Sequence, residues 1–344
     1  MNYRVVAIPG EGIGVEVVEA ALAVLQAVAV LHNFDVEIDY ALLGQPAYEK
    51  YGSYLPKATT QLCQESDGIL FGAVSKGGLL ELRQRFDFFA NLRPVKSHPS
   101  LVDKSSLKRD RTEHVDILFV RELVSGIYFG ESGRSTTAGY HTMYYADNQI
   151  QRIAEVALQK AQQRKQHLTI AHKENALPNL PWTKLVTELA QQKYPDVTVE
   201  PMLVDNLAMQ LVLNPQRFDV IVAGNLFGDI LSDLGGAIVG SIGLLGSASF
   251  NSSGLGLYEP VHGTAPDIAG KNIANPLGAI ASMMMMLAQW GESAAVQSLE
   301  KAWQSILAQG YRTADLYSEA SASSEILVST DELVKLLISN LNPI

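Results

Sequence analysis

Two aspartates spaced by one helical turn are the clearest place in this sequence for metal chemistry. Asp229 and Asp233 lie at positions i and i+4 of the segment NLFGDILSD, so a helix would carry both carboxylates on one face. Like charges at this spacing destabilise a helix by about 0.2–0.5 kcal/mol unless something positive lies between them. The alternative is that Asp229 interacts with the dipole at the helix N-terminus while Asp233 is simply solvated.

A third acid strengthens the metal interpretation. Asp205 follows the strand-like residues 197–204, and α/β folds place active-site groups where buried strands end. Three carboxylates without histidine or cysteine partners suit a hard cation with oxygen ligands, Mg²⁺ or Mn²⁺, rather than zinc. We therefore expect Asp205, Asp229 and Asp233 to bind one divalent ion.

Three arginines provide the complementary charge. Arg83, Arg93 and Arg121 each lie in or beside an apolar segment, and the guanidinium group suits bidentate recognition of a carboxylate. Each of them alone also fits a surface or structural ion pair, and sequence spacing does not bring the three together. With the three aspartates, they would suit a polycarboxylate chelated to a metal.

A lysine and a tyrosine are candidates for moving protons. Lys173 follows the strand-like residues 168–171, and Tyr128 follows Arg121 across a turn at Gly126. A lysine near other positive charge loses part of its proton affinity and can act as a general base, while a tyrosine can donate a proton. A solvated lysine and a core tyrosine are the alternatives.

A loop rich in glycine, proline and asparagine, residues 259–276, leads directly into a helix. Its backbone N–H groups would bind a phosphate, and Asp267 would accept hydrogen bonds from a ribose diol and repel a 2′-phosphate, which favours NAD over NADP. An ordered surface loop is the alternative. Gly10, Gly12 and Gly14 have the spacing G-x-G-x-G rather than G-x-G-x-x-G, so they predict a tight turn from strand to helix rather than a Rossmann site.

Strand-like segments alternate with helix-length segments and must position these side chains. This alternation predicts an α/β protein with a largely parallel sheet. The capping-box spacing of Ser329 and Glu332 predicts a last helix that reaches residue 341. The other expected strands lie at residues 3–8, 34–40, 68–72, 115–120 and 218–223, and the other helices at 14–31, from about 56, 148–165, 182–193, 205–213, 274–289 and 294–309.

Composition excludes several classes of function. The 344 residues include 26 Lys+Arg and 36 Asp+Glu, a net charge of −10, which disfavours a broad nucleic-acid surface. The single cysteine, Cys63, excludes an intramolecular disulfide and a cysteine-rich zinc site. The most apolar stretch, residues 20–31, is about half of the roughly 20 residues that span a bilayer. We expect a cytoplasmic protein with no membrane or nucleic-acid partner.

Taken together, the motifs resemble the β-decarboxylating dehydrogenases, and among these the isopropylmalate dehydrogenases most closely. The resemblance covers nearly the whole chain and rests on IPGEGIG at residues 8–14, RELVSGIYFG at 121–130, Lys173, Asp205-Asn206, the Asp229 segment and the 259–276 loop. It implies an isopropylmalate/isocitrate dehydrogenase-like fold, a large twisted mixed or parallel sheet flanked by helices. It also implies two domains: a discontinuous cofactor-binding domain, residues 1–98 and 241–344, and a metal-binding and dimerisation domain, residues 99–240.

The resemblance also implies roles for individual residues. Arg83, Arg93 and Arg121 match arginines that bind the malate carboxylates, and Leu79 and Leu80 match a hydrophobic pair that faces the substrate's alkyl group. The NAD-contacting positions are matched by Ile13, Asn175, Glu259, His262, Gly263, Thr264, Ala265, Asp267, Ile268 and Asn275.

The residues of the chemical steps are implied in the same way. Asp205, Asp229 and Asp233 match the Mg²⁺/Mn²⁺ ligands, with Asp205 also counted as catalytic. Lys173 matches the lysine involved in deprotonating the C2 hydroxyl, and Tyr128 matches the tyrosine that protonates the enol product. In this family Lys173 and Asp205 enter the site from the neighbouring subunit, so we expect a homodimer with shared active sites.

The activity implied by the resemblance is NAD-dependent oxidative decarboxylation of a 3-substituted malate. The first expected substrate is 3-isopropylmalate, which gives 2-oxoisocaproate in leucine biosynthesis. The connection from Gly72 to Arg83 is shorter than is usual in the family, and Lys76 is its one cation. The same chemistry on 3-benzylmalate, homoisocitrate or tartrate is therefore the alternative, and a non-catalytic regulatory homologue is a more remote one.

Overall fold

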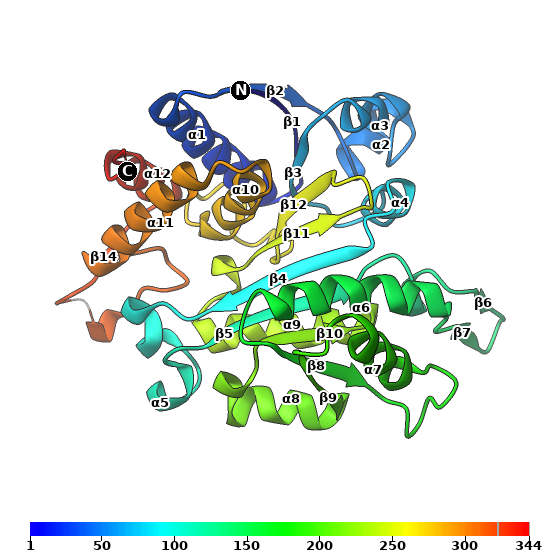
Figure 1. Ribbon diagram of the computed structural model, residues 1–344. Coiled ribbons are helices and arrows are strands. Elements are labelled where there is room, and N and C mark those ends of the chain that lie inside the picture. Colours follow the sequence, from blue (N-terminus) through cyan, green and yellow to red (C-terminus); the bar gives the residue numbers. More distant parts are fainter. Residues whose placement is uncertain (322, 344) are drawn as a thin grey trace. The chain divides into compact units, whose positions relative to one another are not determined.

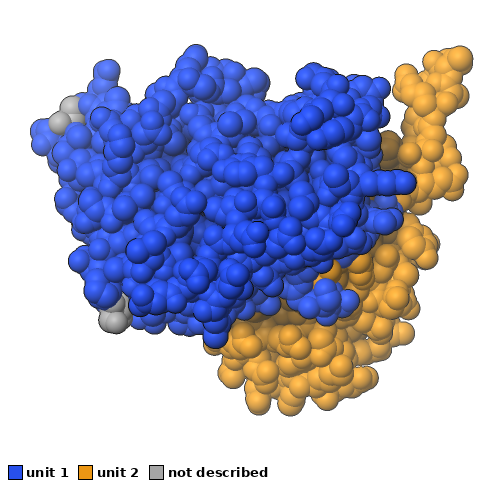
Figure 2. All heavy atoms as spheres, turned by 90° about the horizontal axis from the view of Figure 1, so that it is seen from above, with its two compact units in different colours: residues 1–86, 240–248, 252–344 blue, residues 87–239, 249–251 orange. Residues whose placement is uncertain are grey.

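The computed structural model describes residues 1–321 and 323–343, which form two compact units. The first unit comprises residues 1–86, 240–248 and 252–344, and the second comprises residues 87–239 and 249–251 (Figure 2). The division falls after residue 86 rather than after residue 98, because strand β4 (Ala90–Lys96) pairs along its whole length with β5 (Asp116–Glu122) of the second unit.

The described residues contain the large mixed sheet flanked by helices that the sequence predicts (Figure 1). In the first unit the strand order is β2-β1-β3-β12-β11, with β1 parallel to both β2 and β3. In the second unit the order is β4-β5-β10-β8-β9, in which β4 is antiparallel to β5 and the other pairs are parallel. The sheet is thus largely parallel, as expected, and β4 departs from this expectation.

The first unit is built around buried parallel strands. Residues 5–8 of β1 are wholly enclosed, and a continuous apolar run is typical of a strand covered on both faces. Its elements are β1 (Asn2–Gly10), α1 (Gly14–His32), β2 (Asp35–Tyr40), α2 (Gln45–Tyr51), α3 (Lys57–Gln64), β3 (Gly68–Ala73), α4 (Leu79–Arg85), η4 (Ile242–Leu244), β11 (Gly246–Phe250, whose last residues belong to the second unit), β12 (Gly256–Pro260), α10 (Leu277–Trp290), α11 (Ser293–Ala308), β13 (Tyr311–Arg312), η5 (Glu319–Ser321), β14 (Ile326–Leu327) and α12 (Thr330–Ser339).

Helix α1 is longer than the apolar stretch singled out in the sequence. Among the described residues it is the one helix long and apolar enough to cross a membrane by length and composition. More than half of its most apolar window is buried, and it packs against β1, β3, α10, α11 and α12. These contacts identify α1 as a core helix of the first unit.

The second unit carries most of the predicted chemistry. Helices α6 and α9 both pack on β5, which is buried from Ile117 to Glu122. Its elements are β4, η1 (Pro99–Lys104), α5 (Arg109–Thr112), β5, η2 (Gly126–Tyr128), β6 (Ser132–Arg134), β7 (Gly139–His141), α6 (Asp147–Gln162), β8 (His167–His172), α7 (Trp182–Lys193), β9 (Thr198–Leu203), α8 (Val204–Leu213), η3 (Pro215–Arg217), β10 (Val220–Ala223) and α9 (Asn225–Val239).

The predicted elements all exist, with ends that move by a few residues. Helix α7 has the predicted bounds, and the capping box at Ser329 and Glu332 opens α12. The sequence pattern missed β4, the β6–β7 hairpin, β11 and β12, and the short helices α2, α4 and α5. Strand β4 was missed because Arg93 and Pro94 interrupt its apolar pattern, although the strand is almost entirely buried.

Candidate active site

The paired aspartates lie on one face of α9, as their spacing predicts, and two arginines meet them there. Arg93 donates from Nη1 to Asp233 Oδ1 at 3.0 Å, and its Nη2 lies 3.4 Å from Asp229 Oδ1. Arg121 donates from Nη1 to the same Asp229 oxygen. Tyr128 donates its hydroxyl proton to Asp229 Oδ2 at 2.9 Å. Five of the predicted side chains therefore form one cluster within the second unit.

Strands β4 and β5 of the sheet position the two arginines against α9. Strands β4 and β5 pair so that Asn91 lies opposite Arg121, two residues before Arg93 on the same face of β4. Helix α9 crosses these strands closely because Gly228 lacks a side chain: a Cβ there would lie 2.8 Å from Arg121 Cγ. The glycine of the NLFGDILSD segment thus makes room for the arginine that pairs with the following aspartate.

Both arginines of this cluster are almost wholly buried, so solvent screens their charges only weakly. Arg121 is 1% exposed and Arg93 is 7% exposed. A buried guanidinium needs hydrogen-bond acceptors for all its donors and a negative partner for its charge. The partly exposed Asp229 and Asp233 supply that partner at the open side of the cluster. Packing around Asp233 and the neighbouring Asp229 charge raise the pKa of the Asp233 carboxyl, even with Arg93 beside it.

Lys173 and Asp205 form a separate pair in the same unit. Lys173 follows β8, Asp205 lies in the first turn of α8, and Nζ is 2.5 Å from Asp205 Oδ1. The hydrogen bond from Lys173 lowers the pKa of the Asp205 carboxyl, so the aspartate is ionised. Within residues 1–321 and 323–343 no three acidic, histidine or cysteine side chains gather closely enough to hold a metal. One chain alone therefore does not bring Asp205 to Asp229 and Asp233.

The third arginine, Arg83, lies on α4 in the first unit. Its Nη2 donates to Glu259 Oε1 at 2.6 Å, and both side chains are more than nine-tenths buried. Its Nε is enclosed without a hydrogen-bond partner among the described residues. Leu79 and Leu80 occupy the first turn of the same helix, where Leu79 is half-buried and Leu80 is 45% exposed. Helix α4 thus presents apolar side chains beside a buried cation.

The glycine turn after β1 holds the 259–276 loop in place. Ile13 donates its backbone N–H to the Thr264 carbonyl at 2.9 Å. Gly12 has a φ of +59°, and a Cβ there would lie 2.0 Å from the Thr264 oxygen. The turn is tight, as predicted, and the contact with Thr264 explains why a side chain is not tolerated at position 12.

Two polar side chains of this loop are buried and oriented. His262 donates from Nδ1 to the carbonyl oxygen of its neighbour Gly263 at 2.9 Å, and burial lowers its pKa, so the ring is neutral near pH 7. Asn275 donates from Nδ2 to Asp315 at 3.0 Å. By contrast, Asp267 is exposed. The loop therefore combines the buried, hydrogen-bonded His262 with the exposed carboxylate of Asp267. This arrangement suits an elongated polar cofactor.

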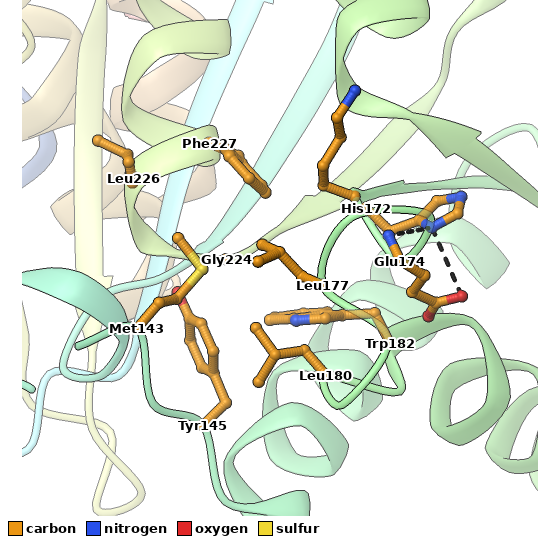
Figure 3. A pocket seen from close by; sticks show the side chains of 11 residues that line it. Met143, Tyr145, His172, Glu174, Leu177, Leu180, Trp182, Gly224, Leu226 and Phe227 are labelled. Carbon is orange, nitrogen blue, oxygen red and sulfur yellow. Dashed lines mark hydrogen bonds and ion pairs between the residues drawn. The ribbon is translucent and has the colours of Figure 1, made fainter.

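A small apolar cavity lies under the loop that carries Lys173 (Figure 3). Leu177, Leu180 and Trp182 line it from this loop and the start of α7, and Phe227 of α9 lies opposite them. Its volume of about 10 Å³ is about that of one water molecule. The cavity is too small for an organic acid, and its apolar lining joins the loop that carries Lys173 to α7 and α9.

Several buried polar residues around the arginines had no predicted role. Asn91 accepts from Arg93 Nε at 2.9 Å, Ser232 accepts from Arg93 Nη1 at 2.9 Å, and Asn225 accepts two hydrogen bonds from Arg121. Glu122 is wholly buried beside Arg121 in the chain. A polar residue at the end of an apolar strand, such as Asn225 after β10, is the sequence signal that points to such a position.

Several known enzymes are similar to this chain. The family model described as isocitrate/isopropylmalate dehydrogenase matches residues 4–337. The 3-isopropylmalate dehydrogenase of Halalkalibacterium halodurans is 44% identical, over 97% of this chain and 98% of its own length. That of Geobacillus kaustophilus is 45% identical, over 97% and 94%.

Solved structures agree with the sequence comparison. The isocitrate dehydrogenase of Methylococcus capsulatus has a TM-score of 0.86 and 31% identity, and the match covers 98% of this chain and 99% of the other. A β-decarboxylating dehydrogenase of Thermococcus kodakarensis has a TM-score of 0.80 and 33% identity, with 98% and 96% covered.

Proposed function

This chain belongs to the isocitrate/isopropylmalate dehydrogenase family, and we propose that it catalyses the NAD-dependent oxidative decarboxylation of a 3-substituted malate, 3-isopropylmalate first. The observation that carries the proposal is the cluster on α9, where two buried arginines meet two aspartates and a tyrosine. Buried guanidinium groups fix the carboxylates of a small dicarboxylate in position. Because the bound substrate has then already lost translational and rotational freedom, the activation barrier of the reaction is lower.

The carboxylates of α9 fit a hard divalent cation. Their donors are oxygen atoms only, and burial, together with the neighbouring Asp229 charge, raises the pKa of the Asp233 carboxyl, so a cation here would stabilise its charged form. In the proposed dimer, Asp229 and Asp233 would hold Mg²⁺ or Mn²⁺ together with Asp205 of the second copy. The cation would supply Lewis-acid stabilisation of the negative charge that develops during decarboxylation.

The protein's own groups move the protons. Lys173 would accept the proton of the C2 hydroxyl, bound NAD⁺ would supply the oxidant for C2, and the resulting β-keto acid would lose CO₂ from C3. Tyr128 then gives a proton to the C3 carbon of the enolate. Burial, together with Asp229, raises the pKa of the Tyr128 hydroxyl, so Tyr128 holds this proton at neutral pH until a strong base forms beside it.

We propose a homodimer in which each active site uses both subunits. Lys173 and Asp205 point to this arrangement, since they form a pair of their own within one chain. Helices α8 and α9, which carry the aspartates, also expose large apolar side chains: Met209 (51%), Val212 (46%), Leu213 (46%) and Ile230 (58%). Exposed apolar residues on two neighbouring helices are typical of a surface that another subunit covers.

The cofactor proposal rests on the 259–276 loop. Its exposed Asp267 would accept hydrogen bonds from an adenosine ribose and repel a 2′-phosphate, which supports NAD over NADP. Ile13, Glu259, His262 and Asn275 are buried around this loop, and we propose Gly263, Thr264, Ala265, Ile268 and Asn175 as further contacts. The single cysteine is buried, and we expect the enzyme to act in the cytoplasm.

The substituent at C3 distinguishes the candidate substrates. Leu79 and Leu80 on α4 support an apolar substituent, such as isopropyl. Lys76 is exposed in the short connection before α4 and would favour the additional carboxylate of homoisocitrate. A bulkier benzyl group or the hydroxyl of tartrate would need a different fit against the same helix.

Steady-state kinetics test the proposal directly. NADH formation is followed by its absorbance with Mg²⁺, NAD⁺ and each of 3-isopropylmalate, 3-benzylmalate, homoisocitrate, isocitrate and tartrate. We expect the highest kcat/KM with 3-isopropylmalate. A preference for another malate would replace the substrate but keep the chemistry, while no NADH from any of them would favour the regulatory alternative.

A further inference from the structure

Asn225, the first residue of α9, makes an unusually complete set of hydrogen bonds with Arg121 and its strand. It has no exposed surface. Its Oδ1 accepts from Arg121 Nη2 at 2.7 Å and from Arg121 Nε at 3.1 Å. Its Nδ2 donates to the carbonyls of Leu123 at 3.0 Å and Ser125 at 2.9 Å. The carbonyls can only accept and the guanidinium can only donate, so the orientation of the amide is fixed by chemistry.

The backbone of Asn225 is fixed as firmly as its side chain. Its N–H donates to the Tyr145 hydroxyl at 2.7 Å. That hydroxyl lies in a gap between two glycines, because a Cβ on Gly126 would be 2.2 Å from it and a Cβ on Gly224 would be 2.7 Å from it. The amide therefore cannot shift without displacing a buried tyrosine, and Arg121 is held against a rigid support.

The contact selects one edge of the guanidinium group. Nε and Nη2 form the side edge of arginine, and both bind the same Asn225 oxygen. Nη1 extends from the other edge to Asp229. An arginine side chain has several rotatable bonds, and bidentate carboxylate recognition requires the correct edge at the correct angle. Asn225 is neutral, so it orients Arg121 without neutralising the charge.

We propose that Asn225 is a positioning residue for Arg121, which keeps the guanidinium edge at Nη1 directed toward the carboxylate of the substrate. This role rests on the proposed dehydrogenase function, in which Arg121 binds that carboxylate. A merely structural role would act on folding alone and would not depend on which residue occupies position 121.

A double-mutant cycle tests the coupling. Asn225→Ala, Arg121→Lys and the double variant are compared by kcat and KM, with the malate that the wild-type enzyme uses best. We expect Asn225→Ala to lower kcat/KM at least about tenfold through KM for the malate, with KM for NAD⁺ unchanged. In the Arg121→Lys background the same change should alter kcat/KM less than about twofold, because lysine lacks the edge that Asn225 holds. Equal losses in both backgrounds would overturn the proposal.

A second measurement needs no turnover. The Nε–H signal of Arg121, assigned in ¹⁵N NMR spectra by its loss in Arg121→Lys, should exchange with solvent at least about ten times faster in Asn225→Ala than in the wild type. If the alanine variant folds poorly, the neutral Asn225→Ser, which also lacks the amide, provides a second variant, and its Arg121 Nε–H should likewise exchange faster than in the wild type. Unchanged exchange in Asn225→Ala would contradict the proposal, and it would do so even if the wild-type enzyme oxidised none of the malates.

The matched control is Ile153→Ala in α6. Ile153 is a wholly buried core residue of the same unit and lies outside the arginine cluster. This variant should lower the unfolding temperature but leave the Arg121 Nε–H exchange and the malate KM unchanged. A rise in KM with this control as large as with Asn225→Ala would mean that general destabilisation explains the effect.

Discussion

The stability of the second unit should depend on the protonation of Glu122, the residue after Arg121. Glu122 is wholly buried. Its carboxylate accepts from the backbone N–H of Ser125 at 2.9 Å and from the Ser125 hydroxyl at 3.1 Å, and Arg152 lies 3.6 Å away. Burial outweighs these favourable contacts and raises the pKa of Glu122 from 4.5 to about 7.

The sign and size of the effect follow from this pKa. Below pH 4.5 the carboxyl is protonated in both the folded and the unfolded chain. As the pH rises toward 7, the unfolded chain loses the proton first, so the folded state becomes less stable. At about 1.36 kcal/mol per pH unit, the destabilisation reaches about 3 kcal/mol above pH 7. For a unit of this size, that is a shift in unfolding temperature of about 6–12 °C.

Glu122→Gln tests this reasoning because glutamine is neutral at every pH. Unfolding temperatures of the wild type and the variant are measured by calorimetry from pH 5 to pH 8.5. The variant should gain about 5–10 °C relative to the wild type between pH 5 and pH 8.5, because about 2.5 kcal/mol of the effect falls in this range. Glu188→Gln, at an exposed position on α7, is measured in parallel as the control. A Glu122→Gln difference that does not change with pH would refute the argument.

Further predictions concern the site itself. Gly228→Ala places a Cβ 2.8 Å from Arg121 Cγ, so the free energy of unfolding should fall by about 1–3 kcal/mol in urea titrations and kcat/KM should fall about 10–100-fold. Gly12→Ala places a Cβ 2.0 Å from the Thr264 oxygen at a positive φ, so KM for NAD⁺ should rise with little change in KM for the malate in initial-rate assays. Asp267→Ser should lower the ratio of kcat/KM for NAD⁺ to that for NADP⁺ at least about tenfold, because a carboxylate repels the 2′-phosphate. Removing divalent ions with EDTA should abolish NADH formation, and added Mg²⁺ or Mn²⁺ should restore it.

Local patterns determined a large part of the fold. Seven strands of the sheet and the long helices were predicted because buried parallel strands form short apolar runs and helices show their own period and caps, as at Ser329. The same reasoning placed Asp229 and Asp233 on one face of α9, since that relation depends on helix geometry alone. The same reasoning failed at β4. Arg93 is charged, as residues of exposed loops often are, but here it is buried and forms its ion pair with α9.

The sequence by itself therefore determined most of the elements, the charges they carry and the chemistry those charges suit. Only the tertiary structure decided which charges meet. Arg121 and Asn225 are 104 residues apart, and their contact exists because β5 and β10 become neighbours in the sheet. Burial also raised the pKa of Glu122, since the pKa of a carboxyl depends on the surfaces that enclose it. These relations arise from strand pairing and packing, which local residue patterns do not specify.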